Sequence, residues 1–140
     1  MKILHTIYDD IGNPWCGGGG ALRALKISRH LAGKHEITLL TGTYPGAIAN
    51  EFQNGLRIQR IGSNRSYALS RLSFSVLASQ ALVREPFDLW VYNFSAFSPL
   101  QASARLRKRC LLEFFHLLSD HATRKYPVFG HIPRLAERLT

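Results

Sequence analysis

A run of four glycines lies between a short apolar segment and a helical one, and it constrains the fold more than any other feature of the sequence. The apolar segment spans residues 2–8 (KILHTIY), the glycines occupy 17–20, and small and apolar residues recur on one face of a helix predicted for 21–32. Glycine loops between a strand and a helix are typical of folds that hold phosphates at a helix start. Four glycines exceed the needs of a tight turn, so we interpret the run as a ligand-facing loop. A purely structural turn is the alternative.

The rest of the chain alternates between strand and helix patterns. Strands are predicted at 36–41, 56–61, 87–92 and 109–115, helices at 70–84 and 99–108, and a loop at 41–55. Such alternation predicts an α/β fold with a doubly wound, mostly parallel sheet and helices on both faces. The 140 residues suffice for one such Rossmann-like domain, spanning 1–140. A short helical piece at 135–139 reaches the last residue without a stop signal, so we expect the chain to be part of something longer.

The glycine run fits neither of two common nucleotide motifs. A P-loop requires a lysine followed by Ser or Thr after its last glycine, and no such pair follows Gly20. A dinucleotide fingerprint starting at Gly17 ends on Leu22, and one starting at Gly18 ends on Arg23. NAD binding is therefore disfavoured.

Polar residues follow the predicted strands at the edge where open parallel sheets bind ligands. Asp9 and Asp10 precede the glycine run, Asn93 and Ser95 follow the fourth strand, and His116 follows the fifth. The aspartates are candidates for orienting a hydroxyl-bearing acceptor, with turn capping as the alternative. His116 is a candidate for contacting a sugar or phosphate, with a structural hydrogen bond as the alternative. No grouping of these residues has metal-ligand spacing.

The formal net charge of +9 favours an anionic partner, although many basic domains are simply soluble. Four arginines on or near the predicted helix 70–84, namely Arg60, Arg65, Arg71 and Arg84, are candidates for contacting an anionic acceptor or membrane. Nucleic acid is not favoured as a partner, because the aromatic residues are not interleaved with Lys and Arg. Two isolated cysteines and the absence of a signal-peptide pattern suit a reducing, cytoplasmic compartment.

Several passages, in order, resemble one known family. They are the opening MKILHTIYDD, then LKISRHLAGKHEITLLTG, NGLRIQRI, FDLWVYNFSAFSPL and LLEFFH. Together with the glycine pair before the first helix, they resemble the N-terminal, acceptor-side domain of glycosyltransferase family 4. That family has the GT-B fold, in which two Rossmann-like domains face each other across a cleft.

The resemblance implies a retaining transfer of a sugar from a nucleotide-sugar donor to an acceptor, without a metal or other cofactor. Gly18 and Gly19 match the glycines that meet the donor diphosphate, Gly20 continues that loop, and His116 matches the histidine that contacts the transferred sugar. The C-terminal donor-binding domain is absent from these residues. We expect it in cis or on a partner chain, and we expect the chain alone to be inactive.

A second hypothesis is a non-catalytic binding subunit. It would recruit an anionic acceptor or a membrane and would need a separate partner half. Under either hypothesis we expect the protein in the cytoplasm, either free or associated with the inner face of the membrane.

Overall fold

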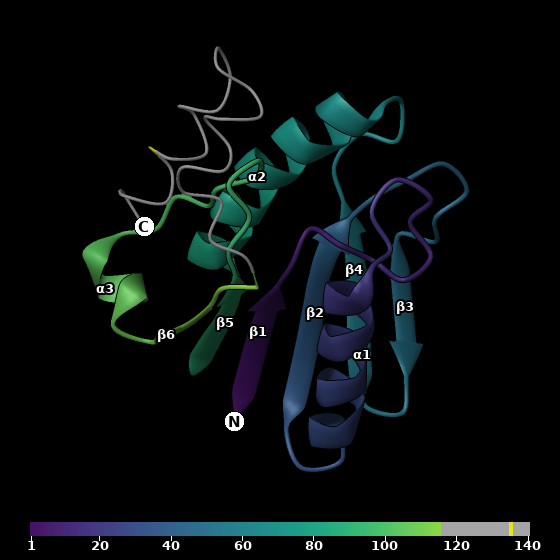
Figure 1. Ribbon diagram of the computed structural model, residues 1–140. Helices are drawn as coiled ribbons and strands as arrows, with labels where there is room; N and C mark the ends of the chain where they lie inside the picture. Colours follow the sequence, from purple (N-terminus) through teal and green to yellow (C-terminus); the bar gives the residue numbers. More distant parts are fainter. Residues whose placement is uncertain (116–134, 136–140) are drawn as a thin grey trace.

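The computed structural model describes residues 1–115 and residue 135. In that part of the chain, one six-stranded sheet carries two long helices and one short one (Figure 1). The elements are β1 (Lys2–Thr6), α1 (Gly19–Ala32), β2 (Glu36–Gly42), β3 (Asn50–Gln53), β4 (Leu56–Ile61), α2 (Tyr67–Arg84), β5 (Leu89–Asn93), α3 (Ala104–Arg107) and β6 (Cys110–Glu113). No helix among the described residues has the length and apolar content needed to cross a membrane.

The strand order is β3-β4-β2-β1-β5-β6, and every neighbouring pair is parallel except β3 with β4. From β1 the chain moves outward to β2 and β4, and it then returns to the other side of β1 to form β5 and β6. The direction of winding therefore reverses between β1 and β5. Ligands of open parallel sheets bind outside the carboxyl ends of the strands at such a reversal point. The predicted doubly wound sheet is confirmed.

Alternate residues of β1 face opposite helices, because successive side chains of a strand point to opposite faces of the sheet. Ile3 packs in a core cluster with Leu25 of α1, whereas Leu4 packs in a second cluster with Phe74 of α2. In Figure 1, α1 covers one face of the sheet and α2 covers the other. Helices on both faces were predicted, and this prediction is also confirmed.

The antiparallel edge strand β3 lies inside the segment that we predicted as loop. A two-residue turn, Asn54–Gly55, joins β3 to β4, and φ is +51° for Asn54 and +83° for Gly55. Asn-Gly is the preferred pair for such a hairpin turn, since both residues tolerate positive φ. The loop prediction is therefore wrong for the residues of β3, Asn50–Gln53.

The helix boundaries differ from the prediction in ways that local chemistry explains. Helix α2 begins three residues earlier than predicted because Ser66 caps it, its hydroxyl accepting from the Leu69 N–H at 3.4 Å. Helix α3 is restricted to Ala104–Arg107, shorter than the predicted 99–108. The shorter helix leaves an irregular connection after β5, and this connection forms one wall of the site described next.

Candidate functional site

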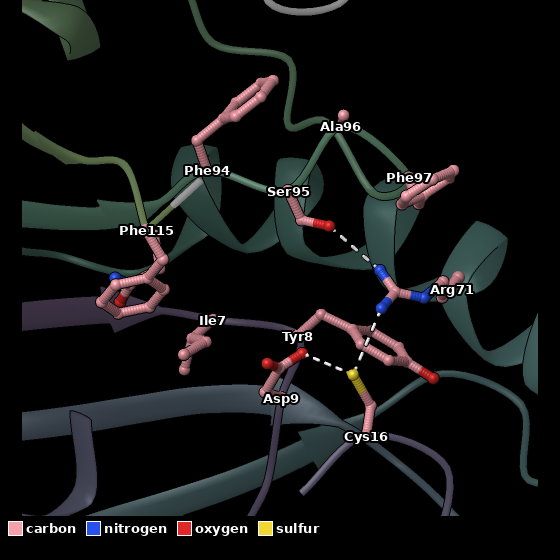
Figure 2. Close-up of a pocket in the computed structure, with 11 residues that line it drawn as sticks. Ile7, Tyr8, Asp9, Cys16, Arg71, Phe94, Ser95, Ala96, Phe97 and Phe115 are labelled. Atoms are coloured by element: carbon pink, nitrogen blue, oxygen red, sulfur yellow. Dashed lines mark hydrogen bonds between the residues drawn. The ribbon is translucent and has the colours of Figure 1, made fainter. Parts of the chain in front are cut away.

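A cavity of about 200 Å³ lies outside the carboxyl ends of β1 and β5, where the winding of the sheet reverses. Its walls come from the loop after β1, the connection after β5, the chain after β6, and α2 (Figure 2). The lining residues are Ile7, Tyr8, Asp9, Cys16, Arg71, Asn93, Phe94, Ser95, Ala96, Phe97 and Phe115. A concave, largely apolar space with a few convergent polar groups is typical of a small-molecule site.

Arg71 brings a guanidinium into this cavity from the second turn of α2, and its side chain lies between Ser95 and Cys16 in Figure 2. One terminal nitrogen, Nη1, donates to the Ser95 hydroxyl at 3.0 Å and to the Ser98 hydroxyl at 3.1 Å. The other, Nη2, donates to the Cys16 sulfur at 3.3 Å. All three acceptors are neutral groups, so none of them compensates the positive charge.

Aromatic rings support the same guanidinium. Its central carbon lies 4.1 Å from the ring centre of Tyr8, 4.9 Å from that of Tyr67 and 5.8 Å from that of Phe97. The negative ring faces attract a cation and help to offset the cost of burying it. They also hold the side chain in one orientation at the cavity wall.

Asp9 and Cys16 form the acidic side of the cavity. The Cys16 thiol donates to the Asp9 carboxylate at 2.9 Å. Burial, reinforced by the neighbouring Asp9, raises the pKa of Cys16 to about 11. The thiol therefore stays protonated near neutral pH and does not serve as a nucleophile.

The four glycines divide into two kinds by what surrounds them. A Cβ on Gly17 would lie 2.9 Å from the Asn13 carbonyl oxygen, and one on Gly20 would lie 3.0 Å from the Phe115 ring. Packing therefore requires glycine at Gly17, where the neighbouring atom belongs to the backbone, whereas a side chain at Gly20 would require the Phe115 ring to shift. A Cβ on Gly18 or Gly19 would have no atom within 4 Å, and neither residue has a positive φ. The fold alone does not explain why these two residues are glycines.

Gly18 and Gly19 also form the start of α1. Gly18 is the N-cap residue, no side chain caps the helix, and its first turn holds no acidic residue. The N–H groups at a helix start carry partial positive charge and have no partners within the helix. The open glycine pair therefore allows an anion to approach these N–H groups closely.

Asp10 lies beside the loop and not in the cavity wall. Its carboxylate is 4% exposed and accepts from Arg60 Nε at 2.8 Å, from the Gly12 N–H at 2.8 Å and from the Thr41 hydroxyl at 3.1 Å. Arg60 in turn pairs with Glu51 at 3.0 Å. These bonds fix the loop after β1 to β2 and β4, which matches the turn-capping alternative considered for the aspartates.

Asn93 lines the cavity, but its side-chain amide is engaged in a buried hydrogen-bond chain. Its oxygen accepts from His5 Nε2 at 2.5 Å, and its nitrogen donates to Glu113 at 2.7 Å. The second ring nitrogen of His5 is bonded to the Ser28 hydroxyl at 3.2 Å. Desolvation by burial lowers the pKa of His5 below 6.5, so the ring is neutral near pH 7. These hydrogen bonds connect β1, β5, β6 and α1 beneath the cavity.

The structure brings together some of the predicted site residues and separates others. Asp9, Asn93 and Ser95 line one cavity, and Gly20 packs on Phe115 in its wall. The prediction for His116 falls outside the described residues. Among the described residues, no group of His, Cys, Asp and Glu is arranged to hold a metal ion.

Arg71 was predicted only as one of four arginines that contact an anionic acceptor or membrane. Arg71 is buried and Arg60 is half-buried with its side chain 8% exposed, whereas Arg65 and Arg84 are exposed. The spacing contained a signal for this: Arg71 shares a helical face with the buried Phe74, Ala78 and Leu82. A charged residue on an otherwise buried helix face marks a position where the fold needs a polar group.

This chain is similar to a known protein in its three-dimensional structure. No protein-family description matches the sequence, and no curated protein matches it. Among solved structures, a sucrose-phosphate synthase from Thermosynechococcus elongatus matches with a TM-score of 0.61 at 16% identity. The match covers 99% of this chain and 39% of the synthase chain. The similarity establishes a Rossmann-like α/β fold, and this chain spans less than half the length of that enzyme.

Proposed function

We propose that the chain is the acceptor-side half of a glycosyltransferase that moves a sugar from a nucleotide-sugar donor to an acceptor. The observation that carries the proposal is the pairing of two features: a largely apolar cavity with a few convergent polar groups at the sheet reversal point, and an open glycine pair at the start of α1. The fold similarity to a sucrose-phosphate synthase and the resemblance to family 4 support it. Retention of configuration and independence from metal ions follow from the family resemblance.

Each part of the site has a role in this proposal. Gly18, Gly19 and the first N–H groups of α1 face the departing diphosphate and stabilise its charge. Asp9 accepts a hydrogen bond from the acceptor hydroxyl and orients it. The aromatic walls pack on the apolar face of a sugar ring.

The donor's base and ribose are bound by a second domain, in cis or on a partner chain. The chain alone therefore positions the acceptor and meets only the donor phosphates. On this proposal it carries out little or no transfer without the second domain, because much of the catalytic effect comes from positioning both substrates.

A non-catalytic binding subunit is the second candidate, and one surface feature favours it. Helix α2 exposes an apolar stripe at helical spacing, formed by Leu69, Leu72, Val76 and Val83, with Leu72 66% and Val83 76% exposed. Such a stripe suits a partner domain or an anionic membrane. Sedimentation with neutral and anionic vesicles at low and high salt distinguishes a membrane from a partner domain. Binding to a membrane requires the anionic lipid and weakens with salt.

Sugar transfer tests the leading proposal. The natural gene product that contains this chain, with any donor-half partner, is incubated with a panel of nucleotide sugars and acceptors. Release of nucleoside diphosphate is then measured. We expect Gly19→Val to reduce turnover roughly 10- to 100-fold by obstructing the diphosphate.

Gly33→Val is the matched control, because Gly33 ends the same helix and likewise has nothing within 4 Å of a Cβ. It should retain normal turnover. Consumption of no donor, or equal turnover in both variants, would contradict the proposal.

A further inference from the structure

Arg71 is a buried cation without a carboxylate partner among the described residues. Its side chain is 9% exposed, and its hydrogen-bond acceptors are two serine hydroxyls and a thiol. Its Nε atom is buried with no hydrogen-bond partner in the described part of the chain. Buried charges in proteins are normally paired, because removing a charge from water without a counter-ion is costly. The arrangement at Arg71 is thus incomplete.

The contrast with Arg60 shows what a complete arrangement in this protein looks like. The side chain of Arg60 is also little exposed, at 8%, and it makes two ion pairs, with Asp10 at 2.8 Å and with Glu51 at 3.0 Å. It supports the fold and lines no part of the cavity. Arg71 lines the cavity, and within residues 1–115 its hydrogen-bond acceptors are all neutral, so its charge is available to a molecule that enters.

We propose that Arg71 binds an anionic group, a phosphate or carboxylate, carried by the acceptor. Guanidinium presents a planar set of donors that matches the oxygens of both groups. Ser95 adds to the site, because its hydroxyl accepts from Arg71 and keeps its own proton to donate to the anion. The inference deepens the proposed function and rests on it for naming the occupant as an acceptor.

The other charged group of the cavity defines the remainder of the acceptor. Asp9 is separated from Arg71 by the Cys16 thiol, which contacts both side chains. An acceptor that satisfies both ends carries a hydroxyl for Asp9 and an oxyanion for Arg71. Sugar phosphates and sugar acids have this combination, whereas neutral sugars lack the anion.

The test uses the chain itself, with inorganic phosphate and acetate as probes at constant ionic strength maintained with chloride. Thermal unfolding and the Nε–H resonance of Arg71 are followed during each titration. We expect an unfolding temperature about 4 °C higher at tenfold excess over the dissociation constant, and a shifted Arg71 resonance. Phosphate acting alone would identify a phosphorylated acceptor, and acetate acting as well would support the broader anionic class.

Two pairs of variants make the test specific. Arg71→Gln should weaken anion binding roughly tenfold or more, whereas Arg84→Gln, at the exposed end of the same helix, should not. Ser95→Asp places a carboxylate beside Arg71 Nη1, so this variant should unfold at a higher temperature and lose anion binding. Ser95→Asn, which removes the hydroxyl without adding a charge, should weaken anion binding far less than Ser95→Asp does.

The Ser95→Asp result keeps the proposal testable even if Arg71→Gln does not fold. The proposal is overturned if neither phosphate nor acetate raises the unfolding temperature and shifts the Arg71 resonance more than chloride does. It is also overturned if Ser95→Asp binds anions as well as the wild type. Either result leaves sugar transfer to a neutral acceptor intact, so the proposed function is tested separately.

Discussion

Alanine substitution within the glycine run separates packing from ligand contact. Gly17 and Gly19 are two residues apart, one in the loop before α1 and one at the first position of α1, and neither has a positive φ. A Cβ at Gly17 meets three backbone carbonyl oxygens, at 2.9, 3.1 and 3.1 Å, whereas a Cβ at Gly19 meets nothing within 4 Å. The fold therefore predicts opposite effects of the same substitution on stability.

The expected magnitudes follow from these surroundings. Gly17→Ala forces its methyl group against backbone atoms that cannot rotate away, at a cost of about 1–3 kcal/mol. Gly19→Ala lies in the first turn of α1, where alanine restricts the unfolded chain and favours the helix. It should increase the free energy of unfolding by about 0.5–1 kcal/mol.

Urea unfolding of the two variants measures the difference directly. Gly19→Ala should unfold at a higher urea concentration than the wild type with an unchanged slope, and Gly17→Ala at a lower one. In the complete enzyme, Gly19→Ala should nevertheless reduce sugar transfer. Destabilisation by Gly19→Ala as large as that by Gly17→Ala would show that both glycines serve the fold, and the ligand-facing interpretation would fail.

Three further predictions concern single residues. Because burial lowers the pKa of His5, the unfolded chain binds a proton below pH 6.5 that the folded chain does not. The free energy of unfolding should therefore fall from about pH 7 to about pH 5, and His5→Gln should show a smaller fall in acid urea titrations. Asp10→Asn should cost about 1.5–3 kcal/mol in urea unfolding, since Arg60 loses its closest partner and keeps its ion pair with Glu51. Cys16, with its pKa raised to about 11, should react with iodoacetamide far more slowly in the folded than in the urea-unfolded chain, as followed by mass spectrometry.

The parallel strands could be predicted because their signals are local. The apolar strand 56–61 was predicted with the bounds that β4 has, and the predicted helix 21–32 falls within α1. Each segment contains its own apolar periodicity, and glycine residues mark where helices end. Their consistent alternation was also sufficient to predict the doubly wound topology.

Edge strand β3 escaped prediction because its sequence, NEFQ, lacks apolar alternation and its side chains are mostly exposed. The Asn54–Gly55 pair beside it was the available signal, and it was counted only as part of a polar loop. A strand of this kind is determined by pairing with β4 and not by its own composition.

The candidate site was predictable in location and only partly in its members. Strand ends indicated Asp9, Asn93 and Ser95, because the carboxyl edge of a parallel sheet follows from strand order. Arg71 comes from a helix far away in sequence, and only tertiary packing brings it between Ser95 and Cys16. The different roles of Asp9 and Asp10 depend on Arg60, fifty residues beyond Asp10.

An amide NMR titration of the chain tests the central claim most directly. We predict that nucleoside diphosphates shift the amides of Gly18 and Gly19, and that hydroxylated sugar phosphates shift those of Asp9 and Ser95. Nucleotide sugars should bind with a dissociation constant of about 1 mM or weaker, because the base and ribose contacts belong to the other half of the enzyme. The account is contradicted if the largest shifts lie at the β3–β4 edge, or if a nucleotide sugar binds with micromolar affinity.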